Sequence, residues 1–205
     1  MTELHFENLR PRDFNLAARF GAEGMHFNKF SDHPLIVTLS GRIFLSMCLE
    51  KSTQVIAAYE GDKLAGILTA AVHGEKPCCR RWRHKAYLAL SLLAHVLPGM
   101  SRGPAVYGEA MHTLIMRYRG DAPAGEISYL AADPSRLGQG IGSALLAELA
   151  RRESGKRLML FTDDSCSYGF YDHMGLERVG TYRTDVGSAG KPRPLTCMLY
   201  MKTFD

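Results

Sequence analysis

Three glycines at alternate positions constrain the fold of this chain more than any other feature. Residues 137–143 read Leu-Gly-Gln-Gly-Ile-Gly-Ser, and they join a strand-like segment, 126–132, to a segment with apolar residues at helical spacing, 141–150. The strand is expected to stop at Asp133 and Pro134, because proline donates no hydrogen bond to a sheet. Glycine lets the backbone approach a ligand closely, and a helix N-terminus offers free N–H groups and a positive dipole end. This order of elements predicts an anion-binding site.

The spacing of the glycine turn separates several interpretations of it. A P-loop needs a lysine and a Ser or Thr after its last glycine, whereas Ser143 and Ala144 follow Gly142. A dinucleotide fingerprint, G-x-G-x-x-G, could begin at Gly138 and Gly140, but Ser143 stands at its last glycine and the strand lies deep in the chain. The segment resembles instead the acyl-CoA loop of the GNAT N-acetyltransferase superfamily, Gln/Arg-x-x-Gly-x-Gly/Ala. A glycine turn that only caps a helix is the remaining alternative.

One position of this loop departs from the family pattern. Leu137 stands where the family has Gln or Arg, and Arg136 comes one residue earlier. The resemblance still implies a pyrophosphate cradle, since the main-chain N–H groups of residues 138–143 can bind phosphates without that side chain.

A second segment, 164–176, carries another family motif. It reads Asp-Ser-Cys-Ser-Tyr-Gly-Phe-Tyr-Asp-His-Met-Gly-Leu, which is similar to the GNAT pattern Asn-x-x-Ala-x-x-Phe-Tyr-x-x-x-Gly-Phe. Asp164 is expected to cap a helix as Asn does, and Gly175 to form its left-handed C-cap. The matching positions are Phe170, Tyr171 and Gly175, with conservative replacements at Asp164, Ser167 and Leu176.

The two motifs together imply the GNAT acyl-CoA N-acyltransferase fold. Its class is α/β (α+β), a mixed, mostly antiparallel central sheet flanked by helices, and we expect a single domain over residues 1–205. Between the third and fourth strands, residues 73–125 form a helical insertion expected to cover one side of the acceptor cleft. The expected strands are 4–9, 54–59, 63–72, 126–132, 156–161, 177–186 and 196–203, and the expected helices are 13–24 (capped by Asp13), 34–50, 80–97, 107–119 and one from 141.

Length and composition agree with one soluble domain and limit its partners. With 205 residues, 46% of them hydrophobic, the chain can bury a full core. The net charge of +4 suits a polyanion such as CoA but is low for a nucleic-acid binder, so no nucleic-acid partner is expected. The five cysteines form no C-x-x-C pair, and the N-terminus has no signal-peptide pattern, so a cytoplasmic location is expected.

The insertion begins with a basic run at residues 80–85, followed by an apolar stretch at 86–97. That stretch is too short for a transmembrane helix, which needs about 20 residues. It could pack in the core, lie on a membrane surface or collect anionic groups. No metal is expected either, because His73, Cys78, Cys79 and His84 fit no zinc-ligand spacing.

The resemblance also implies a mechanism of direct acetyl transfer to an amine. Tyr171 matches the family's general acid, because a phenol with a reference pKa of about 10 stays protonated at neutral pH; a core aromatic is the alternative. Glu126 is the candidate base. The alternative is that Glu126 is only a solvated carboxylate, and that a water chain, with one water oriented by Ser128, takes the proton. The main chain at Leu130 and Ala132 would pair with pantetheine. The residues expected to bind acetyl-CoA are Leu130, Ala131, Ala132, Leu137, Gly138, Gln139, Gly140, Ile141, Gly142, Ser143, Asp164 and Ser167.

The predicted activity is therefore an acyl-CoA-dependent N-acetyltransferase. It would move an acetyl group from acetyl-CoA, the only cosubstrate expected, to a primary amine of a small molecule or a peptide. The alternative is a catalytically weak or inactive CoA-binding sensor or interaction domain, which Leu137 and the basic insertion would also fit. The partners expected for the protein are acetyl-CoA and an amine acceptor, and the sequence allows a homodimer.

Overall fold

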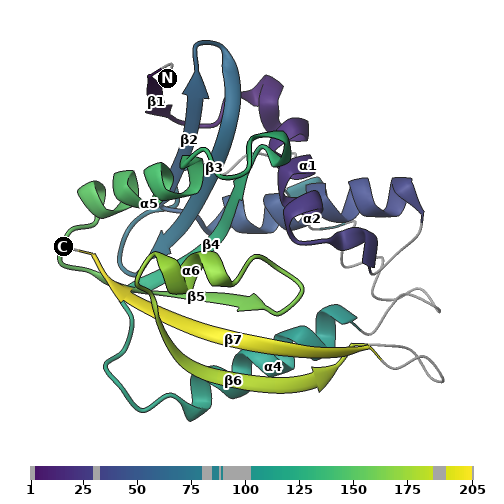
Figure 1. Cartoon of the computed structure of the whole chain (residues 1–205), viewed down its shortest axis with the longest axis vertical. Coiled ribbons are helices and arrows are strands. Elements are labelled where there is room, and N and C mark those ends of the chain that lie inside the picture. Colours follow the sequence, from purple (N-terminus) through teal and green to yellow (C-terminus); the bar gives the residue numbers. More distant parts are fainter. Residues whose placement is uncertain are drawn as a thin grey trace.

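The computed structural model describes residues 3–29, 33–79, 85–87, 89, 103–186 and 193–204. In this part of the chain, seven strands form one sheet in the order β1-β2-β3-β4-β5-β7-β6, shown in Figure 1. Only β4 and β5 pair in parallel, so the predicted mixed, mostly antiparallel sheet is confirmed. The strands are β1 (Leu4–Glu7), β2 (Gln54–Glu60), β3 (Lys63–Val72), β4 (Gly125–Ala132), β5 (Arg157–Asp163), β6 (Glu177–Asp185) and β7 (Pro194–Thr203).

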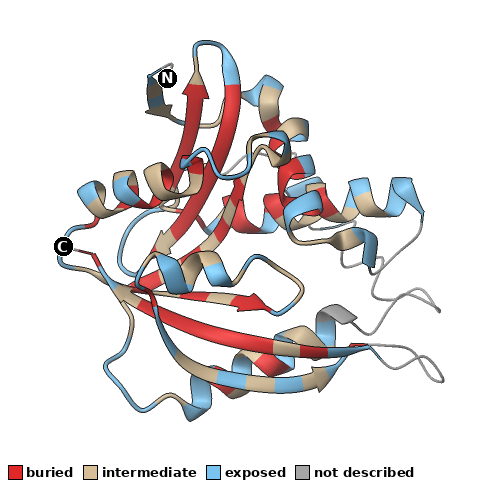
Figure 2. Cartoon of the chain, in the orientation of Figure 1, coloured by how far each residue is buried: buried red, intermediate tan, exposed pale blue. Residues whose placement is uncertain are grey.

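Helices cover both faces of this sheet. One face carries α5, whose apolar stripe packs with Ile56, Leu68 and Leu158 in a single core cluster, together with aromatic residues of α6. The central strands are the most deeply buried part of the molecule, as Figure 2 shows. The helices are α1 (Phe14–Gly24), α2 (Pro34–Lys51), α4 (Gly103–Arg117), α5 (Ile141–Arg152) and α6 (Gly169–His173), with short 3-10 turns η1 (Pro11–Asp13), η2 (Phe27–Lys29) and η3 (Pro134–Arg136).

The opposite face of the sheet is divided between the helix pair α1 and α2 and the single helix α4. Over β2, β3 and β4, helices α1 and α2 enclose a core that includes Phe20, Leu45 and Tyr129. Over β5, β6 and β7, helix α4 encloses another core that includes Leu114 and Leu199, and Figure 1 shows α4 behind β6 and β7. The boundary between the two cores therefore follows the junction of β4 and β5.

The predicted insertion contributes α4 to this arrangement. The helix expected at 107–119 is present, beginning four residues earlier, at Gly103. The helix expected at 80–97 lies largely outside the described residues. Of this segment the structure describes residues 85–87 and 89, and these are helical. None of the helices in the described ranges is long and apolar enough to cross a bilayer.

One predicted helix cap is confirmed only in its position, and another is wrong. Asp13 is the N-cap residue of α1, but its carboxylate makes no capping hydrogen bond and accepts instead from the Tyr59 hydroxyl at 2.9 Å. Helix α6 begins only at Gly169, so Asp164 is too far away to cap it and accepts instead from the Thr196 main-chain N–H at 3.1 Å. In both cases a partner on a distant strand takes the carboxylate. The C-cap prediction is confirmed, because Gly175 has a φ of 70°.

Candidate active site

Strands β4 and β5 pair over a short length and then diverge. The parallel register joins Gly125 to Leu158 and ends at Ile127 and Leu160. Figure 1 shows the two strands starting side by side and separating toward their carboxyl ends. We call this divergence, from Ser128 to Ala132 on β4 and Phe161 to Asp163 on β5, the fork. Beyond Ile127, β5 no longer pairs with the main chain of β4, whose groups on that edge can meet an extended ligand.

A β-bulge coincides with the start of the fork. On the other edge of β4, Thr69 pairs with Tyr129 and Ala70 with Ile127, so Ser128 is an extra residue. A bulge bends its strand and increases the local twist. The side chain of Ser128 is held by Thr69, because the hydroxyl oxygens of the two residues lie 3.0 Å apart, at hydrogen-bond distance. The bulge therefore explains why β4 turns away from β5 at this residue.

The glycine turn follows β4 and leads into α5. Gly138 and Gly140 both have a φ of 77°, a conformation that favours glycine, and a β-carbon at either position would face open space. Gly140 is the N-cap of α5, and the first helical bond runs from the Ala144 N–H to the Gly140 carbonyl at 2.9 Å. The preceding N–H groups, 141–143, thus have no intrahelical acceptor and are suited to an anion.

The side chains beside this turn do not replace the missing Gln or Arg of the family pattern. Leu137 is 79% exposed. Arg136 is engaged elsewhere: its Nε donates to Gln139 Oε1 at 2.9 Å, and its guanidinium pairs with Glu60 at 2.9 Å. The anion-binding capacity of the turn therefore rests on main-chain groups.

Helix α6 brings the second motif against the start of α5. A β-carbon at Gly142 would lie 3.0 Å from the ring of Phe170, so the absence of a side chain allows this approach. The Ser143 hydroxyl lies 3.3 Å from the sulfur of Met174. The two motifs, separated in sequence, thus form one contiguous structure on one face of the sheet.

Tyr171 lies on this same face. Its ring contacts Phe170 and Tyr200, with centroid distances of 5.4 Å and 5.8 Å, and packs on the core that Leu130 and Ala132 also flank. Burial raises the pKa of its phenol above the usual value, which keeps the hydroxyl protonated. Within the described part of the chain this hydroxyl has no hydrogen-bond partner, so it can donate to a ligand.

A polar network holds α6 in place, and the sequence did not reveal it. The Tyr200 hydroxyl donates to Asp172 Oδ1 at 2.8 Å, and Arg178 donates to both residues. Tyr200 and Arg178 lie on β7 and β6, and no spacing in the sequence connects them to Tyr171. Only the sheet register places them beside α6.

Glu126 lies on the opposite face, that of α1 and α2. Its side chain is 19% exposed and pairs with Lys51 of α2 at 3.2 Å. Nearby, the Cys48 thiol donates to the Ser128 carbonyl at 3.3 Å, and burial raises the pKa of this thiol to about 12, so it is no nucleophile. Glu126 and Tyr171 thus flank the sheet from opposite sides.

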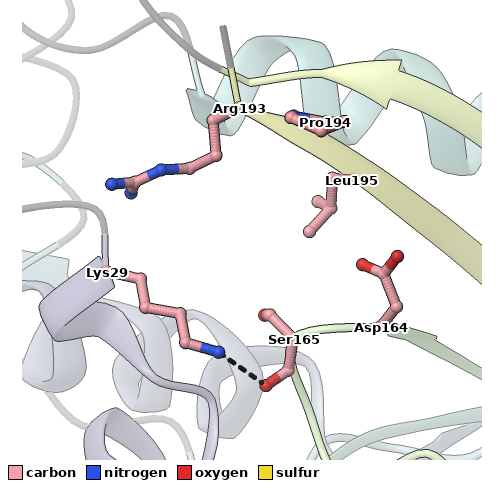
Figure 3. Close-up of a pocket in the computed structure, with 6 residues that line it drawn as sticks. All are labelled: Lys29, Asp164, Ser165, Arg193, Pro194 and Leu195. Carbon is pink, nitrogen blue, oxygen red and sulfur yellow. Dashed lines mark hydrogen bonds between the residues drawn. The ribbon is translucent and has the colours of Figure 1, made fainter. Parts of the chain in front are cut away.

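A cavity of about 360 Å³ lies beyond the end of β5 (Figure 3). Of the predicted site residues, only Asp164 lines it, whereas the exposed Ser167 accepts the Phe170 N–H through its carbonyl at 3.0 Å. Three distant segments meet there, which is why sequence patterns missed its other residues. The cavity is lined by Lys29, Asp164, Ser165, Arg193, Pro194 and Leu195.

No cluster of three or more potential metal ligands occurs among the residues that the structure describes. Cys78 and Cys79 lie together, with their sulfur atoms 3.7 Å apart. His84 is outside the described residues, so the predicted absence of a metal stays a prediction.

Comparison with known proteins identifies relatives of this arrangement. Residues 26–176 match the model of the acetyltransferase (GNAT) family. An N-acetyltransferase from Staphylococcus aureus has a similar structure, with a TM-score of 0.60, 12% identity, and coverage of 97% of this chain and 100% of that chain. The ribosomal-protein-S18-alanine N-acetyltransferase from Escherichia coli gives a TM-score of 0.53 and 15% identity, covering 99% and 95%. At these identities the likeness establishes the fold. No curated protein matches the chain by sequence.

Proposed function

The chain belongs to the acetyltransferase (GNAT) family, and from this premise we propose that it transfers the acetyl group of acetyl-CoA directly to a primary amine of a small molecule or a peptide. Enzymes of this family use acetyl-CoA. The observation that carries the proposal is the fork between β4 and β5, which begins at Ser128 and has the glycine turn at its edge.

The proposed binding mode uses main-chain groups in two places. The N–H groups of residues 141–143, at the positive end of α5, would hold the pyrophosphate. The free edge of β4 at Leu130 and Ala132 would pair with the amides of pantetheine, as a peptide pairs with a sheet edge. The open space around Gly138 and Gly140 supports this fit, because no side chain fills the turn.

The proposed chemistry uses groups on both faces of the sheet. The neutral amine attacks the thioester carbonyl, the carbon–sulfur bond breaks, and the sulfur leaves as a thiolate. Tyr171 gives this thiolate a proton. The raised pKa keeps its phenol protonated before the transfer, and its hydroxyl has no hydrogen-bond partner among the described residues that would compete with the sulfur. Glu126, on the opposite face, accepts the proton that the amine releases, directly or through water.

The proposal is tested by mixing the full chain with acetyl-CoA and a panel of primary amines while free thiol is measured. Thiol release that depends on the amine, with acetylated amine found by mass spectrometry in equal amount, is the expected result. Binding of acetyl-CoA without thiol release from any amine would instead favour a CoA-binding sensor. Hydrolysis at the same rate with and without amine would contradict direct transfer.

A further inference from the structure

The cavity beyond β5 combines charged and apolar side chains. Figure 3 shows the side chains of Lys29 and Arg193 along one side of it and those of Asp164 and Leu195 on the other. Its volume of about 360 Å³ is within the range that holds small molecules. Two cationic groups, one carboxylate and the apolar side chains of Pro194 and Leu195 therefore line an open cavity of small-molecule size.

The cavity lies where an acceptor has to approach the fork. Asp164 and Ser165 directly follow the last residue of β5. Lys29 belongs to η2, which packs on α1 and α2, and Leu195 belongs to the core under α4. Helices α1, α2 and α4 cover the face opposite α5, so the cavity joins segments that adjoin both cores of that face. An acyl donor held on the α5 face would expose its thioester through the fork to this side.

The charges in the cavity are only partly neutralised. The Lys29 ammonium lies 3.5 Å from the Ser165 carbonyl and, within the described ranges, has no carboxylate partner. Asp164 accepts the Thr196 N–H at 3.1 Å. The lining carries two cations, Lys29 and Arg193, and one carboxylate, Asp164. Arg193 has partners of its own, and its main-chain N–H donates to the Asp185 carboxylate at 2.8 Å. Lys29 is therefore the cation that the described part of the chain leaves for an acceptor, and one cation suits a single negative charge.

We propose that this cavity binds the carboxylate of the acceptor, so that the substrate is an amino carboxylic acid. This inference rests on the proposed acetyl transfer. Lys29 would hold the carboxylate by a charge-assisted hydrogen bond, and the positive charge of the neighbouring Arg193 would add to the attraction. Asp164 would disfavour a dianion such as a phosphate, and Pro194 and Leu195 would contact the hydrocarbon part of the acceptor.

The test compares amino acids with their carboxamides, which keep the amine and lose the charge. The wild type should use the acids with the higher kcat/KM. Lys29→Met should raise KM for the acids by about 10- to 100-fold, as expected for one lost charged hydrogen bond, and leave the carboxamides and the KM of acetyl-CoA unchanged. Lys63→Met, an equal charge change at an exposed residue of β3, is the control. Lys29→Glu should shift the preference to the carboxamides.

Three outcomes would overturn the inference. Equal use of acids and carboxamides by the wild type, with no effect of Lys29→Met, would remove the carboxylate site while the acetyl transfer stands. A clear preference for aminoalkyl phosphonates over the matching carboxylic acids would show that the cavity binds a dianion and not a carboxylate. Absence of thiol release with every amine would overturn the proposed function, and this inference with it.

Discussion

The roles proposed for Tyr171 and Glu126 agree with the opposite faces of the sheet on which the two residues lie. Tyr171 packs with α5 and α6, on the side of the glycine turn. Glu126 pairs with Lys51 of α2, on the face that α1 and α2 cover. A group that protonates the leaving sulfur belongs on the donor side, and a group that takes a proton from the amine belongs on the acceptor side.

Replacing Tyr171 by phenylalanine separates the acid role from packing. Tyr171→Phe keeps the ring and its contacts with Phe170 and Tyr200 and removes only the hydroxyl. We expect kcat to fall by about 10²- to 10⁴-fold while the affinity for acetyl-CoA changes little. Steady-state kinetics at saturating amine, with Tyr182→Phe as control, measure this. Full kcat in Tyr171→Phe, with chemistry limiting the wild-type rate, would refute the acid role.

Replacing Glu126 by glutamine should reveal the base through pH. Glu126→Gln is expected to lower kcat/KM for the amine by about 10²-fold at neutral pH. The loss should shrink as pH rises, because a larger fraction of the amine is then already neutral. Lys51→Met breaks the same ion pair and keeps the carboxylate, so it should cost little. A pH-rate profile of Glu126→Gln that matches the wild type would exclude this base.

At the scale of elements, the sequence predicted the strands and the glycine turn well because their evidence is local. Periodicity, proline and glycine are properties of neighbouring residues. The bulge at Ser128 depends on how β3 pairs with β4, and the carboxylates of Asp13 and Asp164 were drawn to Tyr59 and Thr196 on distant strands. Contacts of that kind have no periodic trace in the sequence, so the fork and the caps could not be predicted from local rules.

The glycine turn can be tested as an element with a matched control. Gly140→Glu places bulk and negative charge at the start of α5, where the phosphates are expected. Acetyl-CoA should raise the Tm of the wild type, since it binds the folded state, and this rise should disappear in Gly140→Glu. Gly155 has a φ of 79° and equally open surroundings, so Gly155→Glu imposes the same backbone strain away from the turn.

The two glycine variants separate a loss of acetyl-CoA binding at the glycine turn from a general loss of stability. Both should lose some stability because of their left-handed backbone. Only Gly155→Glu should keep the full rise of Tm with acetyl-CoA. An undiminished rise in Gly140→Glu would mean that the phosphates bind elsewhere.

At the scale of the whole molecule, the sheet keeps one continuous core on the α5 face and two cores on the other. The long insertion was visible in the sequence as an excess of residues between two strands. Where α4 packs was not, because its partners Leu195 and Leu199 follow it by about eighty residues or more. The cavity was invisible for the same reason, since its walls come from three separate segments of the chain, at residues 29, 164–165 and 193–195.

Amide hydrogen exchange of the full chain, with and without acetyl-CoA, tests the central claim most directly. The account predicts slower exchange in two stretches when acetyl-CoA is added: residues 128–132 on the β4 side of the fork, and residues 138–143 in the glycine turn. Strand β1, at the far edge of the sheet, should be unaffected. Binding detected by calorimetry with unchanged exchange in both stretches would contradict the proposed location of acetyl-CoA in the fork.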